Sequence, residues 1–290
     1  MTAGEKGMPG SGTLSITALV ENTAESPGLL AEHGASFWIE RNGRTFLFDT
    51  GQGMTLGHNA QSLDIPICRQ AEALVLSHGH YDHTGGLGEF LAMCPKAVLH
   101  AHPAAFDPKF SRKSNGQVRP VGIPGSDGDR QAWKTLSIAV TAPMEIVPGV
   151  FVTGPIPRIT DFEDTGGDFY LDETCTRPDP LLDDQALFCR TAGGIVVLLG
   201  CAHAGIVNTI RYIRTLVGGT SLEAVIGGMH LINASPKRIG KTVSELKILG
   251  VRRVYPSHCT GVAAVTAMHE AFPDQCLPCH VGTNLTFPTA

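Results

Sequence analysis

The stretch Ser-His-Gly-His-Tyr-Asp-His-Thr-Gly-Gly, residues 77–86, constrains this chain more than any other part of its sequence. It follows the apolar run Ala-Leu-Val-Leu, which is typical of a buried β-strand. His78 and His80 are two residues apart, so their side chains would share one face of an extended chain. Asp82 and His83 then need a turn to reach the same region. Neutral imidazoles and a carboxylate suit zinc and similar divalent metals, so four such groups in one loop predict two adjacent metal positions.

Three further histidines come directly after short apolar runs, at positions where active sites of sheet-based folds gather. These residues are His203, His230 and His258. A single histidine is more often a surface or core group than a ligand. Three of them at predicted strand ends, in a chain that also has the cluster above, indicate one metal-binding site.

The spacing His-x-His-x-Asp-His after a strand is the signature of the metallo-β-lactamase superfamily, and this chain resembles that superfamily from about residue 13 to its end. The longer string SHGHYDHTGGL is similar to one branch, which includes metal-dependent hydrolases and dihydropterin–ribofuranosylaminobenzene 5'-phosphate synthases. Other stretches resemble the same branch, in its order: 30–34, 47–51, 156–158, 200–208, 227–231 and 258–261. The resemblance implies an α/β (α+β) fold, an αββα sandwich of two mixed β-sheets flanked by helices.

The resemblance also implies a ligand set. Three residues would hold each of two metals: His78, His80 and His203 the first, and Asp82, His83 and His258 the second. Asp82 would in addition orient the nucleophile, as the catalytic residue. Many superfamily members place an aspartate or a cysteine between the metals, where this chain has Met229 and His230. The bridging position is therefore open, with His230 and Asp184 as candidates.

Zinc is the expected cofactor, as one or two ions, and manganese, iron or magnesium are not excluded. Asp49 resembles a structural aspartate of the superfamily, so we expect it to orient the ligand loop by hydrogen bonds without touching metal. Glu32, His33 and Arg158 match the branch and are candidates for substrate binding. The alternative for Glu32 and His33 is that they cap or orient a loop. Arg158 suits a carboxylate or phosphate because its guanidinium donates two parallel hydrogen bonds.

Two functions are consistent with this resemblance. The first is a metal-dependent hydrolase, in which zinc lowers the pKa of a bound water from about 15.7 toward ~7 and supplies hydroxide to attack an ester, lactone or phosphoester. The second is a transferase of the pterin-synthase type, in which metal neutralises a departing pyrophosphate and Glu32 or Glu163 recognises the pterin ring. A non-catalytic metal protein is a third class, and the near-complete ligand set argues against it.

Composition is that of an ordinary soluble globular protein, with 42% hydrophobic and 17% charged residues in a chain of 290. No apolar run approaches the roughly 20 residues that a membrane helix needs. The net charge is −5 and no dense basic run occurs, so nothing indicates a nucleic-acid surface. We expect a small-molecule substrate, anionic if Arg158 binds it, with no nucleic-acid or membrane partner. The oligomeric state is unknown at this stage.

Residues 1–12 are small and polar and contain no signal-peptide segment. We expect a disordered leader or an expression remnant there, followed by a single cytoplasmic domain over 13–290. Residues near 104–145 are rich in Gly, Pro, Ser and charge, which predicts a loop-rich insertion in that domain.

The eight cysteines are expected to be reduced thiols, because no export signal precedes them. Cys189 and Cys201 lie within or beside apolar runs and are predicted core residues. Cys276 and Cys279 belong to a Cys-x-x-Cys-His pattern, which also occurs at c-type haem attachment sites. Haem attachment normally requires export, so we interpret the pattern as a local thiol pair or a chance match.

Overall fold

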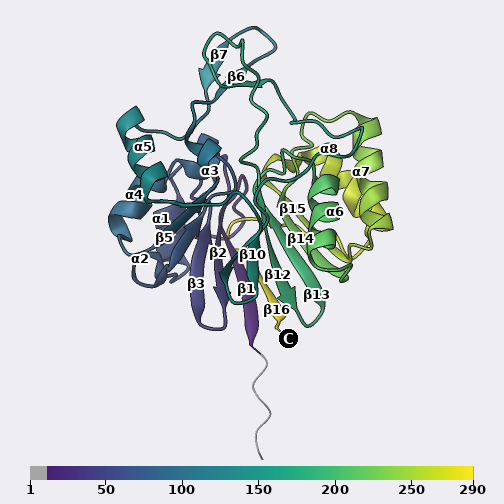
Figure 1. The fold of residues 1–290 in the computed structure, drawn as a ribbon. Coiled ribbons are helices and arrows are strands. Elements are labelled where there is room, and N and C mark those ends of the chain that lie inside the picture. The colour runs from purple at the N-terminus through teal and green to yellow at the C-terminus, as the bar shows by residue number, and fades with distance from the viewer. Residues whose placement is uncertain (1–11, 290) are drawn as a thin grey trace, which may run out of the picture.

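The computed structural model describes residues 12–289, and these residues form four layers (Figure 1). Two large sheets pack face to face in the centre, and helices cover the outer side of each sheet. This arrangement is the αββα sandwich that the resemblance implied. The expected leader falls almost wholly on residues outside the described range. Within that range, no helix has both the length and the apolar character needed to cross a membrane.

The first sheet has seven strands in the order β16-β1-β2-β3-β4-β5-β8. The strands are β1 (Thr13–Val20), β2 (Ser36–Arg41), β3 (Arg44–Phe48), β4 (Ala73–Val75), β5 (Val98–Ala101), β8 (Ile138–Ala139) and β16 (Asn284–Pro288). The run from β3 to β8 is parallel, whereas β16, β1, β2 and β3 pair antiparallel. Asn42 and Gly43 join β2 to β3 with positive φ angles of 50° and 78°, as a tight hairpin turn requires.

The second sheet has six strands in the order β15-β14-β13-β12-β10-β9. The strands are β9 (Met144–Val147), β10 (Val150–Val152), β12 (Ala186–Thr191), β13 (Gly194–Leu199), β14 (Leu222–Gly228) and β15 (Arg253–Ser257). Because β13, β14 and β15 are parallel, their carboxyl ends meet at the same edge of the sheet.

Both faces of each sheet are buried, which explains why the strands have nearly continuous apolar sequences. In β2, Phe37 and Ile39 pack between the two sheets, while Trp38 packs toward the helices. In β13, Val196 faces the other sheet and Val197 faces the helices. The core therefore has three clusters, one between the sheets and one under each helical layer.

Helices of the outer layers come from both halves of the chain. The first sheet is flanked by α1 (Leu56–Ser62), α2 (Ile67–Gln70), α4 (Leu87–Met93) and α5 (Asp127–Leu136), and the second by α6 (Ile206–Leu216), α7 (Pro236–Ile248) and α8 (Val262–Ala271). Short helical turns are α3 (Tyr81–Thr84), η1 (Pro103–Phe106) and η2 (His258–Thr260). The eight cysteines are free thiols, and Cys276 and Cys279 lie in different core clusters.

The segment near 104–145 is more regular than the expected loop-rich insertion. It contains α5 and the hairpin of β6 (Phe110–Arg112) and β7 (Val118–Pro120), and β11 (Phe169–Tyr170) pairs with β6 to form a small third sheet. Ser126 and Asp129 form a capping box at the start of α5. None of the α5 residues is buried, and Trp133 packs partly buried against the core cluster of this helical layer. The third sheet stands above one end of the two large sheets (Figure 1).

Candidate metal centre

The ends of two strands bring the first group of predicted ligands together. His78 and His80 lie in the loop after β4, and His203 lies in the loop after β13. All three side chains are buried, and each offers a ring nitrogen that lies within 4.8 Å of those of the other two. The first predicted ligand set therefore converges although its members come from different sheets.

The second predicted set is assembled only in part, because Asp82 and His258 share a donor group with His33, whereas His83 shares one with His78 and Cys201. Nε2 of His83 is 3.2 Å from Nε2 of His258, which in turn is 3.4 Å from Oδ2 of Asp82. His33, a substrate-binding candidate, joins this group, because its Nε2 lies 3.2 Å from the same carboxylate oxygen. Burial opposes ionisation of Asp82, but the adjacent imidazoles of His258 and His33 outweigh burial and hold its pKa well below the usual range.

The hydrogen bonds of His83 and His258 point to a cation between them. Nδ1 of His83 bonds to Oδ2 of Asp49 at 2.7 Å, and Nδ1 of His258 bonds to Oδ1 of Asn22 at 3.0 Å. Both Nδ1 atoms therefore carry the proton and act as donors. In a neutral imidazole the Nε2 atom then has an unprotonated lone pair, so the lone pairs of the two Nε2 atoms face each other. A proton or a metal ion between them removes this conflict. The donor set thus fits a divalent metal.

The first group gives a second indication. Nε2 of His80 and Nε2 of His203 are buried and have no hydrogen-bond partner among the described residues. Leaving a buried polar atom unpaired costs about 1–3 kcal/mol, so such atoms normally have a ligand. Burial also lowers the pKa of His80 to about 3 and that of His203 well below its usual value. Neutral imidazoles held in this way are suited to binding metal.

Asp49 fixes the ligand loop by hydrogen bonds, as expected for a structural aspartate. It belongs to none of the possible metal-binding groups among the described residues. Its Oδ1 accepts the N–H of Ser77 at 2.7 Å, and its Oδ2 accepts the Ser77 hydroxyl at 2.6 Å. The backbone of Asp49 is left-handed, with φ 62°, and so is that of His230 (44°) and His258 (50°). Strained backbone of this kind persists where surrounding contacts fix it, and it is concentrated at functional sites.

A buried ion triad supports the same loop from the side of the insertion. The N–H of Gly79 donates to Oδ2 of Asp183 at 2.7 Å. Nζ of Lys109 lies 3.0 Å from Oδ1 of Asp183 and 2.8 Å from Oδ2 of Asp179. A Cβ atom at Gly79 would lie 2.1 Å from the carbonyl oxygen of Ala105, so only glycine fits here. Asp183 therefore links the metal loop, through Gly79, to Lys109, which directly precedes β6 of the third sheet.

Two cysteines at the centre were not predicted as site residues. Cys201, expected to be a plain core residue, places its Sγ 3.1 Å from Nε2 of His83 and 3.3 Å from Sγ of Cys259. Both thiols line the cavity above the ligands. One signal could have identified Cys201: it lies two residues before His203, the same spacing that relates His78 to His80.

Neither expected bridging candidate lies between the two groups. Asp184 accepts the N–H of Ala204 through Oδ2 at 2.7 Å, and none of its oxygens joins a donor group among the described residues. Burial raises the pKa of Asp184 to about 7. His230 shares a donor group with Cys201 and Cys259 but not with the ligand histidines. Among the described residues, no donor group joins Asp184 or His230 to the ligand histidines, although Oδ1 of Asp184 and Nδ1 of His230 are also buried without a hydrogen-bond partner.

A cavity of about 580 Å³ lies above the ligands and under the third sheet. Its floor includes metal-group residues, and its roof carries three basic side chains, Arg112, Lys113 and Arg119. Phe169 closes the roof over the first group, with its ring centroid 4.7 Å from that of His80. Positive charge over the mouth of this cavity favours an anionic substrate.

The other substrate candidates lie outside this cavity. The carboxylate of Glu32 accepts three backbone N–H groups from residues 52–55 at 2.8–3.0 Å, so it fixes a loop, as the alternative interpretation proposed. Arg158 donates to the carbonyl of Pro180 and does not line the cavity. Glu163 accepts two backbone N–H groups at the start of α6. Sequence reasoning missed the roof residues, which lie in the expected loop.

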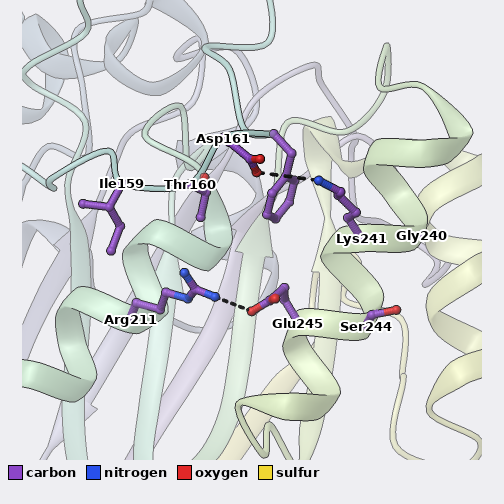
Figure 2. Close-up of a pocket in the computed structure, with 9 residues that line it drawn as sticks. Ile159, Thr160, Asp161, Arg211, Gly240, Lys241, Ser244 and Glu245 are labelled. Carbon is purple, nitrogen blue, oxygen red and sulfur yellow. Dashed lines mark hydrogen bonds and ion pairs between the residues drawn. The ribbon is translucent and has the colours of Figure 1, made fainter.

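A second cavity, of about 630 Å³, lies between the loop 159–162 and helices α6 and α7 (Figure 2). Its charged side chains pair with one another: Arg211 with Glu245 at 2.7 Å, and Lys241 with Asp161 at 3.6 Å. No histidine or cysteine lines it. By contrast, the cavity over the metal groups is lined by histidines and cysteines of those groups.

Comparisons with known proteins agree with this geometry. The family described as "Metallo-beta-lactamase superfamily" matches residues 30–258. The chain is 31% identical over 286 residues to the 7,8-dihydropterin-6-methyl-4-(beta-D-ribofuranosyl)-aminobenzene-5'-phosphate synthase of Methanocaldococcus jannaschii, covering 94% of this chain and 97% of the relative.

Solved structures have the same fold. A crystal structure described as a metal-dependent hydrolase of the beta-lactamase superfamily is 30% identical, with a TM-score of 0.78 over 94% of this chain and 98% of the other. A diphosphatase of the PhnP family shares the fold at 14% identity, with a TM-score of 0.52 over 96% of this chain and 98% of the other.

Proposed function

Because the chain belongs to the metallo-beta-lactamase superfamily, we propose that it is a metal-dependent hydrolase acting on a phosphorylated small molecule. The observation that carries the proposal is one cavity with buried imidazoles and a carboxylate at its floor and three basic side chains at its roof. The floor suits metal-assisted hydrolysis, and the roof suits a phosphoester better than a neutral ester or lactone.

Zinc is the proposed metal, because imidazole-rich sites with nearby thiols suit it. His78, His80 and His203 would hold one ion. His258 and Asp82 would hold a second together with His83, whose Nε2 lies 3.2 Å from that of His258. A bound divalent ion would supply Lewis acidity and lower the pKa of water.

Asp82 and His33 are the groups placed to handle protons. The Asp82 carboxylate lines the cavity and lies 3.2 Å from Nε2 of His33, so it can orient a water. The His33 side chain is 53% exposed at the mouth, where it can exchange a proton with solvent or a leaving group. The pair connects the buried floor with solvent.

The roof residues would bind the phosphate. Arg112 is partly neutralised by Asp168 at 3.6 Å and lies over the ring of Tyr170. Arg119 lies 6.0 Å above the ring of Tyr81 and, like Lys113, has no carboxylate partner among the described residues. Arg119 and Lys113 thus keep their charge available to a substrate, although the whole chain has a net charge of −5.

The test uses zinc-loaded protein and matched phosphodiester, phosphomonoester, diphosphate, lactone and carboxylic ester substrates. We expect phosphorylated compounds to be turned over and a chelator to abolish turnover. Arg119→Ala should lower kcat/KM for them about 10- to 100-fold, the loss of one charged hydrogen bond of about 1.5–3 kcal/mol. Lys134→Ala, outside the cavity, is the control. Full activity in metal-free protein, or preference for neutral esters, would overturn the proposal.

A pterin-synthase-type transferase is the second candidate, and the 31% identity with the Methanocaldococcus jannaschii synthase favours it. The basic roof would then hold a departing pyrophosphate. Glu32 and Glu163, the carboxylates expected to recognise pterin, are both committed to backbone N–H groups. Asp168, which lines the cavity, is the alternative partner for the ring.

Incubation with dihydropterin pyrophosphate and the ribofuranosylaminobenzene 5'-phosphate separates the two functions. A coupled product with release of pyrophosphate would establish the transferase. Hydrolysis of the pyrophosphate compound without coupling would support the hydrolase.

A further inference from the structure

Cys201 contacts both halves of the metal centre. It follows β13 directly after Gly200, and its thiol is buried. Its Sγ is within 4.8 Å of the donor nitrogens of His78 and His83. His78 belongs to the first group and His83 to the second, so the sulfur atom lies at their junction.

The expected bridging position, which directly follows β14, provides no donor group shared with His78 or His83. Met229 is buried in the apolar core beneath the helices. The ring of His230 packs 4.3 Å from that of His203 and 6.3 Å from that of Phe169. Its donor nitrogens do not join those of His83, so the ring lies to one side of the junction.

The neighbouring thiol has a different environment. Sγ of Cys259 lies 3.3 Å from Sγ of Cys201 and accepts the backbone N–H of His230 at 3.3 Å. Cys259 shares no donor group with His78 or His83. It therefore lies behind Cys201, where its S–H can donate to the Cys201 sulfur and hold it in place.

We propose that Cys201 is a thiolate metal ligand at the junction of the two groups, entering from β13, the strand that also leads to His203. The inference rests on the proposed metal-dependent function. Cys259 is a positioning residue. Sulfur at this point would bias the centre toward zinc and other thiophilic ions and against magnesium and manganese, which prefer oxygen ligands.

Cobalt(II)-loaded protein under reducing conditions provides the test, because cobalt bound to thiolate has an intense near-ultraviolet charge-transfer band. We expect wild type to bind two cobalt ions per chain and to show this band. Cys201→Ser should lose the band and one ion. Cys201→Asp should recover the second ion without the band and should take up more manganese relative to zinc. Cys259→Ser, the matched control, should keep the band.

Three results would overturn the inference: cobalt bound to wild type without the band, a band that survives in Cys201→Ser, or a band lost only in Cys259→Ser. The first leaves the metal-dependent function intact, because the visible bands of bound cobalt still report an occupied centre. Failure of wild type to bind any cobalt or zinc refutes both the function and the inference. Wild type alone decides the presence of sulfur ligation, even if a variant does not fold.

Discussion

Replacing Lys109 by methionine tests whether the buried ion triad supports the metal loop. The side chain of Lys109 is fully buried, and those of Asp179 and Asp183 are 3% and 0% exposed. Methionine fills nearly the same space but carries no charge, so two carboxylates lose their cation. Removing one partner of a buried ion pair typically costs about 3–5 kcal/mol. We expect the free energy of unfolding to fall by about 3 kcal/mol, at the lower end of this range. The reason is that each carboxylate keeps one backbone hydrogen bond: Asp179 from Leu181, and Asp183 from Gly79.

The loss should depend on pH in a defined direction. Burial alone raises the pKa of Asp183, but Lys109 outweighs burial and holds it below the usual value. In wild type this contribution is present above the unfolded pKa of about 3.9 and is lost as pH falls through the lower folded pKa. In Lys109→Met the buried carboxyls have raised pKa values, so the folded variant binds more protons and becomes more stable as pH falls. The gap to wild type should narrow between about pH 8 and about pH 5.

Urea unfolding with excess chelator measures this gap without a contribution from metal binding. Lys134→Met is the matched control, since Lys134 pairs with Asp107 at 3.4 Å and both side chains are substantially exposed. It should cost less than about 1 kcal/mol. The reasoning is refuted if Lys109→Met costs no more than this control, or if its cost stays constant over the pH range.

Three further changes test separate parts of the structure. Asp49→Asn should weaken metal binding about 10- to 100-fold, because the partner of His83 Nδ1 loses its charge; competition with a chromophoric chelator measures this, and unchanged affinity would contradict it. Gly79→Ala should lower metal content in elemental analysis, because its Cβ would meet the Ala105 carbonyl oxygen at 2.1 Å; full occupancy would show that the loop can move. Ser126→Ala should reduce hydrogen-exchange protection in α5 by about 1 kcal/mol, and equal protection would show that the cap is dispensable.

Local patterns predicted strands and candidate ligands, whereas the αββα arrangement of two packed sheets was implied by the family resemblance alone. Apolar runs marked the central strands, and ligands directly after them, such as His78 and His203, had to meet at the edges of the sheets. Contacts between residues far apart in the sequence could not be predicted from these patterns. The third sheet that carries Arg112 is completed by β11, which pairs with β6 from more than fifty residues later in the sequence, with Ser111 opposite Phe169.

Residue type does not separate two roles that share the same burial. Cys201 is as buried as a core cysteine, and burial is what an apolar neighbourhood predicts. Its place beside His83 depends on how two sheets meet, which strand patterns do not contain. Glu32 is the opposite case, a predicted binding residue with a structural role. Its carboxylate, next to His33 in the sequence, was a candidate for substrate binding, but it accepts backbone N–H groups of a loop.

Because β1 pairs with β16, the first sheet can be completed only after the last of its strands has been synthesised. β1 lies between β2, which follows it closely, and β16, whose Asn284 bonds to Ser15 across 269 positions of sequence. Until residues 284–288 leave the ribosome, one edge of β1 has unpaired N–H and C=O groups, and such an edge is a template for association with other chains. A nascent chain must keep this edge protected while its second half is made. Solubility during synthesis is therefore tied to the last strand, far from any ligand.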